Sequence, residues 1–273
     1  MNTRFDLAII GGGLAGCAAA VRVLQNAPNA KVLLLERGRY PRQKVCGEFL
    51  SSEGVAALRQ IAVRSEPLQR LLAAAITIQR ARIHVVQRSA EFPVEPAALS
   101  LSRSVLDSAL WQHAIALGAD CRTECNVSKM EGEGPFHLRT GCGEFHARAV
   151  INASGRWSAI SAARQQPKNG QHWIGLKAHY REREPEQCVD LYFFPHGYCG
   201  VQPAGESAVN VCAMVRADAA TRLDQLFKLT PALAARSTRW TPLMEPVATA
   251  PLIFHRPAPI LRRLFNAGDA AGF

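Results

Sequence analysis

A glycine-rich segment near the amino terminus has the residue types and spacing of a dinucleotide-binding loop. Its glycines are Gly11, Gly13 and Gly16, and Leu14 and Ala15 lie between them. Gly11 permits a tight turn, Gly13 lets the backbone approach a pyrophosphate, and Gly16 allows close helix packing. A helix that begins here directs the positive end of its dipole at the phosphates. We therefore expect this loop to bind the diphosphate of a dinucleotide.

An acidic residue follows at the spacing that this kind of site requires. Glu36 lies twenty residues after Gly16, at the end of the next apolar segment. A carboxylate there accepts hydrogen bonds from the adenosine ribose hydroxyls. The glycines, both flanking apolar segments and the acid together are a strong signal, whereas the glycines alone are a weak one. The pattern leaves FAD and NAD open, because both are bound in this way.

The elements that must position these residues follow from the hydrophobic pattern. Residues 6–10 and 31–36 are short apolar runs that favour buried parallel strands. Residues 14–25 are rich in Ala, Val and Leu without a helix breaker, which favours a helix. A βαβ unit is therefore expected by residue 36. Residues 37–53 are polar and contain Gly and Pro, so we expect an irregular excursion over the strand ends.

The rest of the chain divides into a further helix and a β-rich region. Residues 100–118 predict a helix capped by Ser102 or Ser104. Residues 172–215 contain alternating apolar stretches, which predict antiparallel strands with one covered face. Further strands are expected at 75–86, 90–94 and 264–267, and a short helix at 218–229.

Composition is that of a globular protein of about two domains. The chain has 273 residues, of which 48% are hydrophobic and 20% charged, and its formal net charge is +10. Because the basic residues are spread along the chain rather than clustered, we expect a solvated basic surface and no nucleic-acid partner. Two polyanionic cofactors, a flavin and a nicotinamide, would also suit this charge.

The cysteine pattern and the amino terminus bear on metal binding and compartment. The spacings of the eight cysteines do not give the paired short clusters of a zinc site, so no metal is expected. A chain of this length has no need of disulfides. The first residues lack the apolar region of a signal peptide, which favours the cytoplasm. No apolar run is long enough to span a bilayer, so membrane association is at most peripheral.

Four separated segments resemble the FAD-dependent oxidoreductases of the geranylgeranyl reductase and flavin halogenase branch, which share the fold of the p-hydroxybenzoate hydroxylase group. They occur in the family's order, which chance rarely produces. The segments are 6–16 with Leu35-Glu36-Arg37 and 41–48, then Ser102-Arg103 with Leu106-Asp107 and Leu110, then Asn152-Ala153-Ser154-Gly155-Arg156, and finally Gly268-Asp269-Ala270-Ala271-Gly272-Phe273.

The resemblance implies an α/β fold. A Rossmann-like FAD-binding domain with a parallel sheet is expected to be discontinuous in sequence and to carry an inserted, mostly antiparallel substrate domain. The FAD-binding domain would comprise residues 1–75, 100–165 and 255–273. The substrate domain would comprise residues 76–99 and 166–254.

The resemblance also implies cofactor contacts. Arg103 would reach the phosphate side of the flavin, Val127 would lie where the backbone meets the adenine, and Asp269, after Gly268, would hydrogen-bond the ribityl chain. Further cofactor-binding residues are expected in the segments after the second strand, and these are Arg37, Arg42, Lys44, Cys46 and Gly47.

Cys46 is the candidate catalytic residue. In the reductase branch, the Cys-Gly turn after Arg-x-Lys lies beside the isoalloxazine ring. A thiol there could position substrate or donate a proton if neighbours such as Arg42 and Lys44 activate it. The alternative, which has equal weight, is a small buried cysteine in a tight turn.

Departures from the family narrow the activity. The hydroxylases carry an aspartate where this chain has Ser154, which disfavours a direct NAD(P)H-dependent aromatic hydroxylase. Halogenases use a lysine and a Trp-x-Trp-x-Ile-Pro signature, but no lysine lies between Lys44 and Lys129 and the signature is absent. The reductase pattern Tyr-x-Trp-x-Phe-Pro is reduced to Tyr198 and Pro203, which leaves the substrate open.

Our expectation is an FAD-dependent oxidoreductase that reduces a carbon-carbon double bond of a small apolar, isoprenoid- or polyketide-like substrate. NAD(P)H or a separate protein would be the electron donor. The alternatives are a flavin monooxygenase and an inactive FAD-binding remnant. The second alternative is motivated by the end of the chain at Phe273, where the family continues, so we expect a truncated enzyme.

Overall fold

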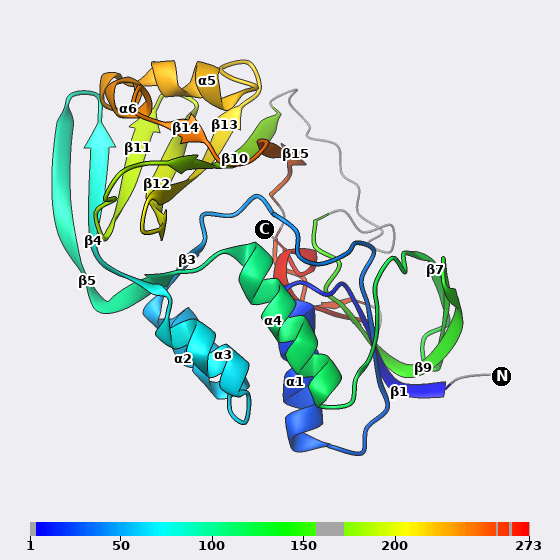
Figure 1. Ribbon diagram of the computed structural model, residues 1–273. Helices are drawn as coiled ribbons and strands as arrows, with labels where there is room; N and C mark the ends of the chain where they lie inside the picture. The colour runs from blue at the N-terminus through cyan, green and yellow to red at the C-terminus, as the bar shows by residue number, and fades with distance from the viewer. Residues whose placement is uncertain (1–3, 157–171, 255, 262–263, 273) are drawn as a thin grey trace.

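The computed structural model describes residues 4–156, 172–254, 256–261 and 264–272. These residues form two β-sheets that lie side by side, each covered by helices (Figure 1). Phe273 and residues 157–165, which belong to the expected FAD-binding domain, lie outside the described residues.

The first sheet has a parallel centre, as predicted. Its order is β6-β2-β1-β9-β17-β16, in which β6, β2, β1, β9 and β17 are parallel neighbours. An antiparallel ribbon of β7 and β8 is attached to β9. The strands are β1 (Arg4–Ile10), β2 (Val32–Leu35), β6 (Asp120–Arg122), β7 (Val127–Glu131), β8 (Phe136–Thr140), β9 (Gly143–Asn152), β16 (Ile260–Leu261) and β17 (Leu264–Asn266).

Both faces of the parallel strands are buried, which explains their continuous apolar sequence. Leu7 and Ile9 of β1 pack against the helical layer, whereas Ala8 and Ile10 pack against the β7–β8 ribbon. In Figure 1, α1 and α4 lie side by side to the left of β1 and β9, with α2 and α3 next to them. The helices are α1 (Leu14–Asn26), α2 (Ser52–Ile61), α3 (Glu66–Ala73) and α4 (Arg103–Ala116).

The second sheet is mostly antiparallel, as predicted. Its order is β14-β10-β13-β12-β11-β4-β5-β3, with β15 also paired to β10, and β11 and β4 are a parallel pair. The strands are β3 (Phe49–Leu50), β4 (Ile76–Val85), β5 (Arg88–Ser100), β10 (Trp173–Arg181), β11 (Cys188–Phe194), β12 (Gly197–Gly205), β13 (Ala208–Arg216), β14 (Thr241–Pro242) and β15 (Val247–Leu252).

Short helices cover the outer face of this sheet (Figure 1). They are α5 (Leu223–Leu226), the 3-10 turn η1 (Phe227–Leu229) and α6 (Pro231–Ser237). The Tyr180 ring stacks on Trp240 with centroids 5.4 Å apart, and Phe227 meets Trp240 edge-on at 5.2 Å. The other face of the sheet turns toward the first sheet. A last 3-10 turn, η2 (Gly268–Ala270), follows β17.

Several expected elements differ from the structure. The expected helix 218–229 shrinks to α5 and η1, because the Arg216–Asp218 ion pair and a Gln225 side chain that accepts from the Thr221 amide hold turns instead. The helix expected from residue 100 begins at Arg103, because β5 continues through Ser100 and pairs with β4 and β3.

Three helices, α2, α3 and α6, were not predicted. The excursion expected to reach residue 53 ends where the Ser51 hydroxyl accepts from the Gly54 amide and caps α2. Thr230 caps α6 in the same way. Ser51 and Thr230 were the readable cap signals for α2 and α6, whereas the Ser65 side chain makes no capping hydrogen bond at α3.

A disulfide joins Cys125 and Cys142, although the sequence offered no reason to expect one. It ties the segment before β7 to the turn between β8 and β9. Across the part of the chain that the structure describes, no helix is both long enough and apolar enough to cross a membrane.

Candidate cofactor-binding site

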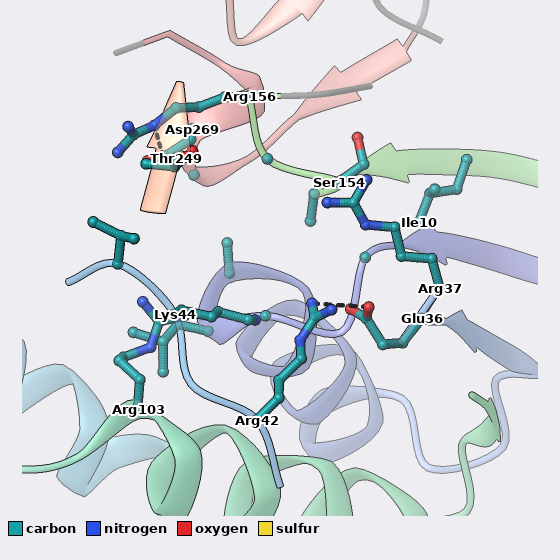
Figure 2. A pocket seen from close by; sticks show the side chains of 18 of the residues that line it. Ile10, Glu36, Arg37, Arg42, Lys44, Arg103, Ser154, Arg156, Thr249 and Asp269 are labelled. Atoms are coloured by element: carbon teal, nitrogen blue, oxygen red, sulfur yellow. Dashed lines mark hydrogen bonds and ion pairs between the residues drawn. The ribbon is translucent and has the colours of Figure 1, made fainter. Parts of the chain in front are cut away.

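A cavity of about 650 Å³ lies at the carboxyl ends of β1, β2 and β9 (Figure 2). Every predicted cofactor residue lines it except Gly16, Cys46 and Gly47. The lining also includes β15 of the second sheet, so both sheets contribute to one cavity. Ligands bind at this end of parallel strands in doubly wound folds, which agrees with the sequence interpretation.

The glycine loop has the geometry that its spacing predicted. Gly11 has a φ of +107°, and a Cβ there would collide with the Ala153 carbonyl oxygen. A Cβ on Gly16 would collide with the Gly11 carbonyl, so Gly16 supports the loop from beneath rather than lining the cavity. At Gly13 the nearest atom to a Cβ would be Lys44 Nζ, at 3.3 Å. Gly13 therefore leaves open space where a diphosphate must approach the backbone.

The last segment of the chain meets this loop. Gly268 has a φ of +62°, and a Cβ there would lie 2.9 Å from the Ala15 Cβ. Gly268 and Asp269 line the same cavity as Gly11 and Gly13. One extended dinucleotide can therefore contact both ends of the chain, which a single FAD site requires.

Glu36 organises the loops around the cavity. It is 3% exposed, and its carboxylate accepts from the Gly12 amide at 2.9 Å and from the Gly38 amide at 2.8 Å. It also pairs with Arg42 at 2.9 Å (Figure 2). A carboxylate has about four acceptor positions, so capacity remains for the ribose hydroxyls that the sequence predicted.

Two cations next to the glycine loop share one buried carboxylate. Arg103 binds Asp107 through Nε at 2.8 Å and Nη2 at 3.0 Å, and Lys44 Nζ binds it at 2.6 Å. Asp107 is fully buried. Burial lowers the pKa of Arg103, but its hydrogen bond to Asp107 and the negative charge there outweigh burial and raise it. Arg103 is therefore a fixed cation rather than a solvated helix residue.

Asp269 lies across the cavity from these cations. It pairs with Arg156, with Nε and Oδ2 2.9 Å apart (Figure 2). The pair brings the Asn152–Arg156 segment and the terminal segment together at the cavity wall. Asp269 is thus placed at the cavity, and its contact with a ribityl chain stays a prediction.

The charge of the lining fits a diphosphate. Five basic side chains face two acidic ones, and they are Arg37, Arg42, Lys44, Arg103 and Arg156 against Glu36 and Asp269. Among the described residues, the Arg42 Nε is one of the few buried polar side-chain atoms without a partner. A bound dianion offsets this positive excess and supplies acceptors. The positive charge of the lining and the open space at Gly13 therefore both fit the diphosphate of FAD.

Cys46 lies beside the cavity without lining it. Its Sγ accepts from the Glu48 amide at 3.4 Å and contacts the Arg103 side chain. The carbonyls of Cys46 and Gly47 accept from Asn210 Nδ2 at 3.2 and 2.8 Å. The turn is therefore bound to the second sheet, and its thiol lies one residue from the lining residue Val45.

Sequence reasoning missed Asp107 as a site residue, although it was part of the family segment. Its spacing of four from Arg103 on a helix was the available signal, because such pairs face one another. It also missed Val247, Ala248 and Thr249, which line the cavity from β15. No local signal marks these three, since they reach the cavity through the pairing of β15 with β10.

The fold and the site together define a protein with a dinucleotide-binding domain of the Rossmann type. A family model described as FAD dependent oxidoreductase matches residues 94–272. The chain therefore belongs to this family, which confirms the family and the α/β fold class expected from the sequence, and FAD is the cofactor that the family uses.

Two relatives are named as reductases. The chain is 30% identical over 248 residues to digeranylgeranylglycerophospholipid reductase 2 of Methanopyrus kandleri, which covers 84% of this chain and 59% of that protein. It is 35% identical over 65 residues to menaquinone reductase of Mycolicibacterium smegmatis, which covers 24% of this chain and 15% of that protein. The chain thus spans less than two thirds of the length of either relative.

Solved structures of flavin-dependent halogenases share the fold. The myxobacterial chondrochloren halogenase has a TM-score of 0.80 at 20% identity, covering 99% of this chain and 69% of that one. A flavin-dependent brominase has a TM-score of 0.82 at 18% identity, covering 99% and 73%. At these identities the likeness shows the fold and does not assign halogenation.

Proposed function

We propose that this protein uses FAD to reduce a carbon-carbon double bond of a small apolar substrate. The observation that carries the proposal is a single cavity with two kinds of lining. Its basic part, around Lys44 and Arg103, suits a diphosphate, and its apolar part, with Val45 and Val247, lies at the second sheet. The relatives named as a menaquinone reductase and a digeranylgeranylglycerophospholipid reductase support an apolar substrate over a polar one.

The residues of this chain have distinct parts in the proposal. Reduced FAD supplies the hydride for one carbon of the double bond. The other carbon requires a proton, and Cys46 is the proposed donor because its thiol lies next to the cavity beside Arg103. The glycine loop, Glu36 and Asp269 hold the cofactor. Either NAD(P)H or a separate protein restores its electrons.

The test is an anaerobic turnover assay with chemically reduced FAD and a geranylgeranyl lipid. The expected result is a product that has gained one hydrogen molecule per reduced bond, detected by mass spectrometry. The Cys46→Ser variant should reduce the double bond more slowly without binding FAD more weakly. Product that forms only with oxygen, and contains it, would show a monooxygenase instead.

A separate measurement tests the alternative that the protein is an inactive FAD-binding remnant. Native mass spectrometry of the purified protein should show bound FAD, and the absence of FAD would favour a remnant. The cytoplasmic location, the absence of a nucleic-acid partner and at most peripheral membrane contact belong to the same proposal. Cell fractionation tests the location and the membrane contact, and salt-dependent filter binding tests the nucleic acid.

A further inference from the structure

We propose that Lys177, on β10 of the second sheet, is a positioning residue for the cofactor site: with Asn210 it clamps residues 43–48, the segment that presents Lys44 and Cys46. The inference rests on the FAD binding described above. Lys177 itself does not line the cavity, so its proposed role is to hold residues that do.

Lys177 holds both ends of the segment. Its side chain is fully buried. The ammonium donates to Gln43 Oε1 at 2.8 Å and to Glu48 Oε1 at 2.5 Å. One charge from a strand more than a hundred residues away thus joins the first and last residues of this short loop.

Glu48 is the centre of the clamp. It is buried at a φ of +60°, and its carboxylate accepts from His179 Nε2 at 2.9 Å and from the Arg103 amide at 3.0 Å, besides Lys177. Burial raises the pKa of Glu48, but hydrogen bonds from His179 and Lys177 and the Lys177 charge outweigh burial and lower it. The left-handed backbone of Glu48 persists because these contacts hold it.

Asn210 holds the middle of the segment. It lies on β13 directly opposite His179, and it is 1% exposed. Its Nδ2 donates to the carbonyls of Cys46 and Gly47. The turn that carries the candidate catalytic thiol is therefore hydrogen-bonded to a strand of the second sheet.

The residues between these anchors face the cavity. Lys44 lies above Gly13, and Val45 packs so closely on Gly175 that a Cβ there would lie 2.8 Å from Val45 Cγ1. If the anchors are lost, Lys44 keeps its ion pair with Asp107, but its backbone loses the contacts to the second sheet that hold it over Gly13. Cofactor affinity should then fall even where the fold survives, because a site displaced by about 1 Å loses its directed hydrogen bonds.

The experiment compares Lys177→Met with a matched buried ion pair elsewhere. Arg236 is 15% exposed, belongs to the same sheet unit and binds Asp190 and Glu182, but it does not touch residues 43–48. FAD dissociation constants are measured by fluorescence quenching, and folding by circular dichroism. We expect Lys177→Met to raise the dissociation constant at least tenfold, and Arg236→Met to lower the melting temperature with a constant within twofold of wild type.

Unchanged FAD affinity in Lys177→Met, or an equal loss in Arg236→Met, would overturn the proposal, since a general loss of stability would then explain the data. Where Lys177→Met fails to fold, the double variant Lys177→Met with Glu48→Gln removes the unpaired buried charge. It should melt closer to wild type and still bind FAD at least tenfold more weakly. Wild-type affinity in the double variant would also overturn the clamp.

A second measurement separates the clamp from the proposed function. The rate of Cys46 alkylation in the cofactor-free protein, followed by peptide mass spectrometry, measures how accessible the thiol of this loop is without FAD. It should rise several-fold in Lys177→Met and in Asn210→Leu, and not in Arg236→Met. A wild-type protein that takes up no FAD would refute the proposed function, whereas unchanged Cys46 rates would refute the clamp.

Discussion

Gly11 and Gly13 lie in the same loop but tolerate a side chain differently. Gly11 combines a positive φ with a collision against the Ala153 backbone, whereas a Cβ on Gly13 would meet only the side-chain ends of Lys44 and Arg103. We predict that Gly11→Ala lowers the melting temperature, because backbone must shift. Gly13→Ala should fold normally and weaken FAD binding at least tenfold, because its methyl fills the approach to the diphosphate.

Thermal melts and FAD titrations of both variants check this contrast. Gly141→Ala is the control, because no atom lies within 4 Å of a Cβ there. It should match wild type in both measurements. Wild-type FAD affinity in Gly13→Ala would contradict the placement of the diphosphate over this loop.

Asp107 is the residue whose loss should cost most stability in the site. Asp107→Asn leaves Lys44 and Arg103 without their shared carboxylate, and breaking such a buried pair costs about 3 kcal/mol. Urea denaturation should show this loss in the free energy of unfolding. The exposed Asp120–Arg122 pair supplies the control, since Asp120→Asn should change stability by less than about 1 kcal/mol.

At the scale of elements, β10 contacts the segment 43–48 through the buried ammonium of Lys177. Its apolar residues Ile174, Leu176 and Ala178 face the covered side, as their alternation predicted, and Lys177 points to the opposite face. The structure buries Lys177 there, because the segment 43–48 lies over that face. A pattern with period two identifies two faces of a strand, but it does not show what covers the second.

This contact predicts a pH dependence. The pKa of Glu48 is lowered in the folded protein relative to its ordinary value of 4.5. The stabilisation is complete above that ordinary value and is lost as the pH falls through the lowered folded pKa. Free energies of unfolding measured across this acidic range should fall more in wild type than in Glu48→Gln. Parallel curves for the two proteins would contradict the assignment.

At the scale of the whole molecule, the cavity belongs to both sheets. FAD that contacts both should stabilise them together, and binding at a hundred times the dissociation constant adds about 2.7 kcal/mol to the free energy of unfolding. Trp111 on α4 and Trp240 beside α6 report on the two units. Variants that retain one tryptophan each should show equal shifts in melting temperature when FAD is added. A shift in one alone would show that the units unfold separately.

The sequence alone determined the βαβ unit, the parallel sheet and most of the predicted residues that the structure places in the cavity lining, because Gly11, Gly13 and Glu36 depend on local geometry and fixed spacing. Tertiary structure alone decided that Gly268 meets Ala15, that β15 lines the cavity and that Lys177 holds the loop before Glu48. These contacts join segments far apart in the chain, and no local pattern encodes which distant partner covers a face. The physical reason is that burial and charge pairing become defined only when the two sheets pack together.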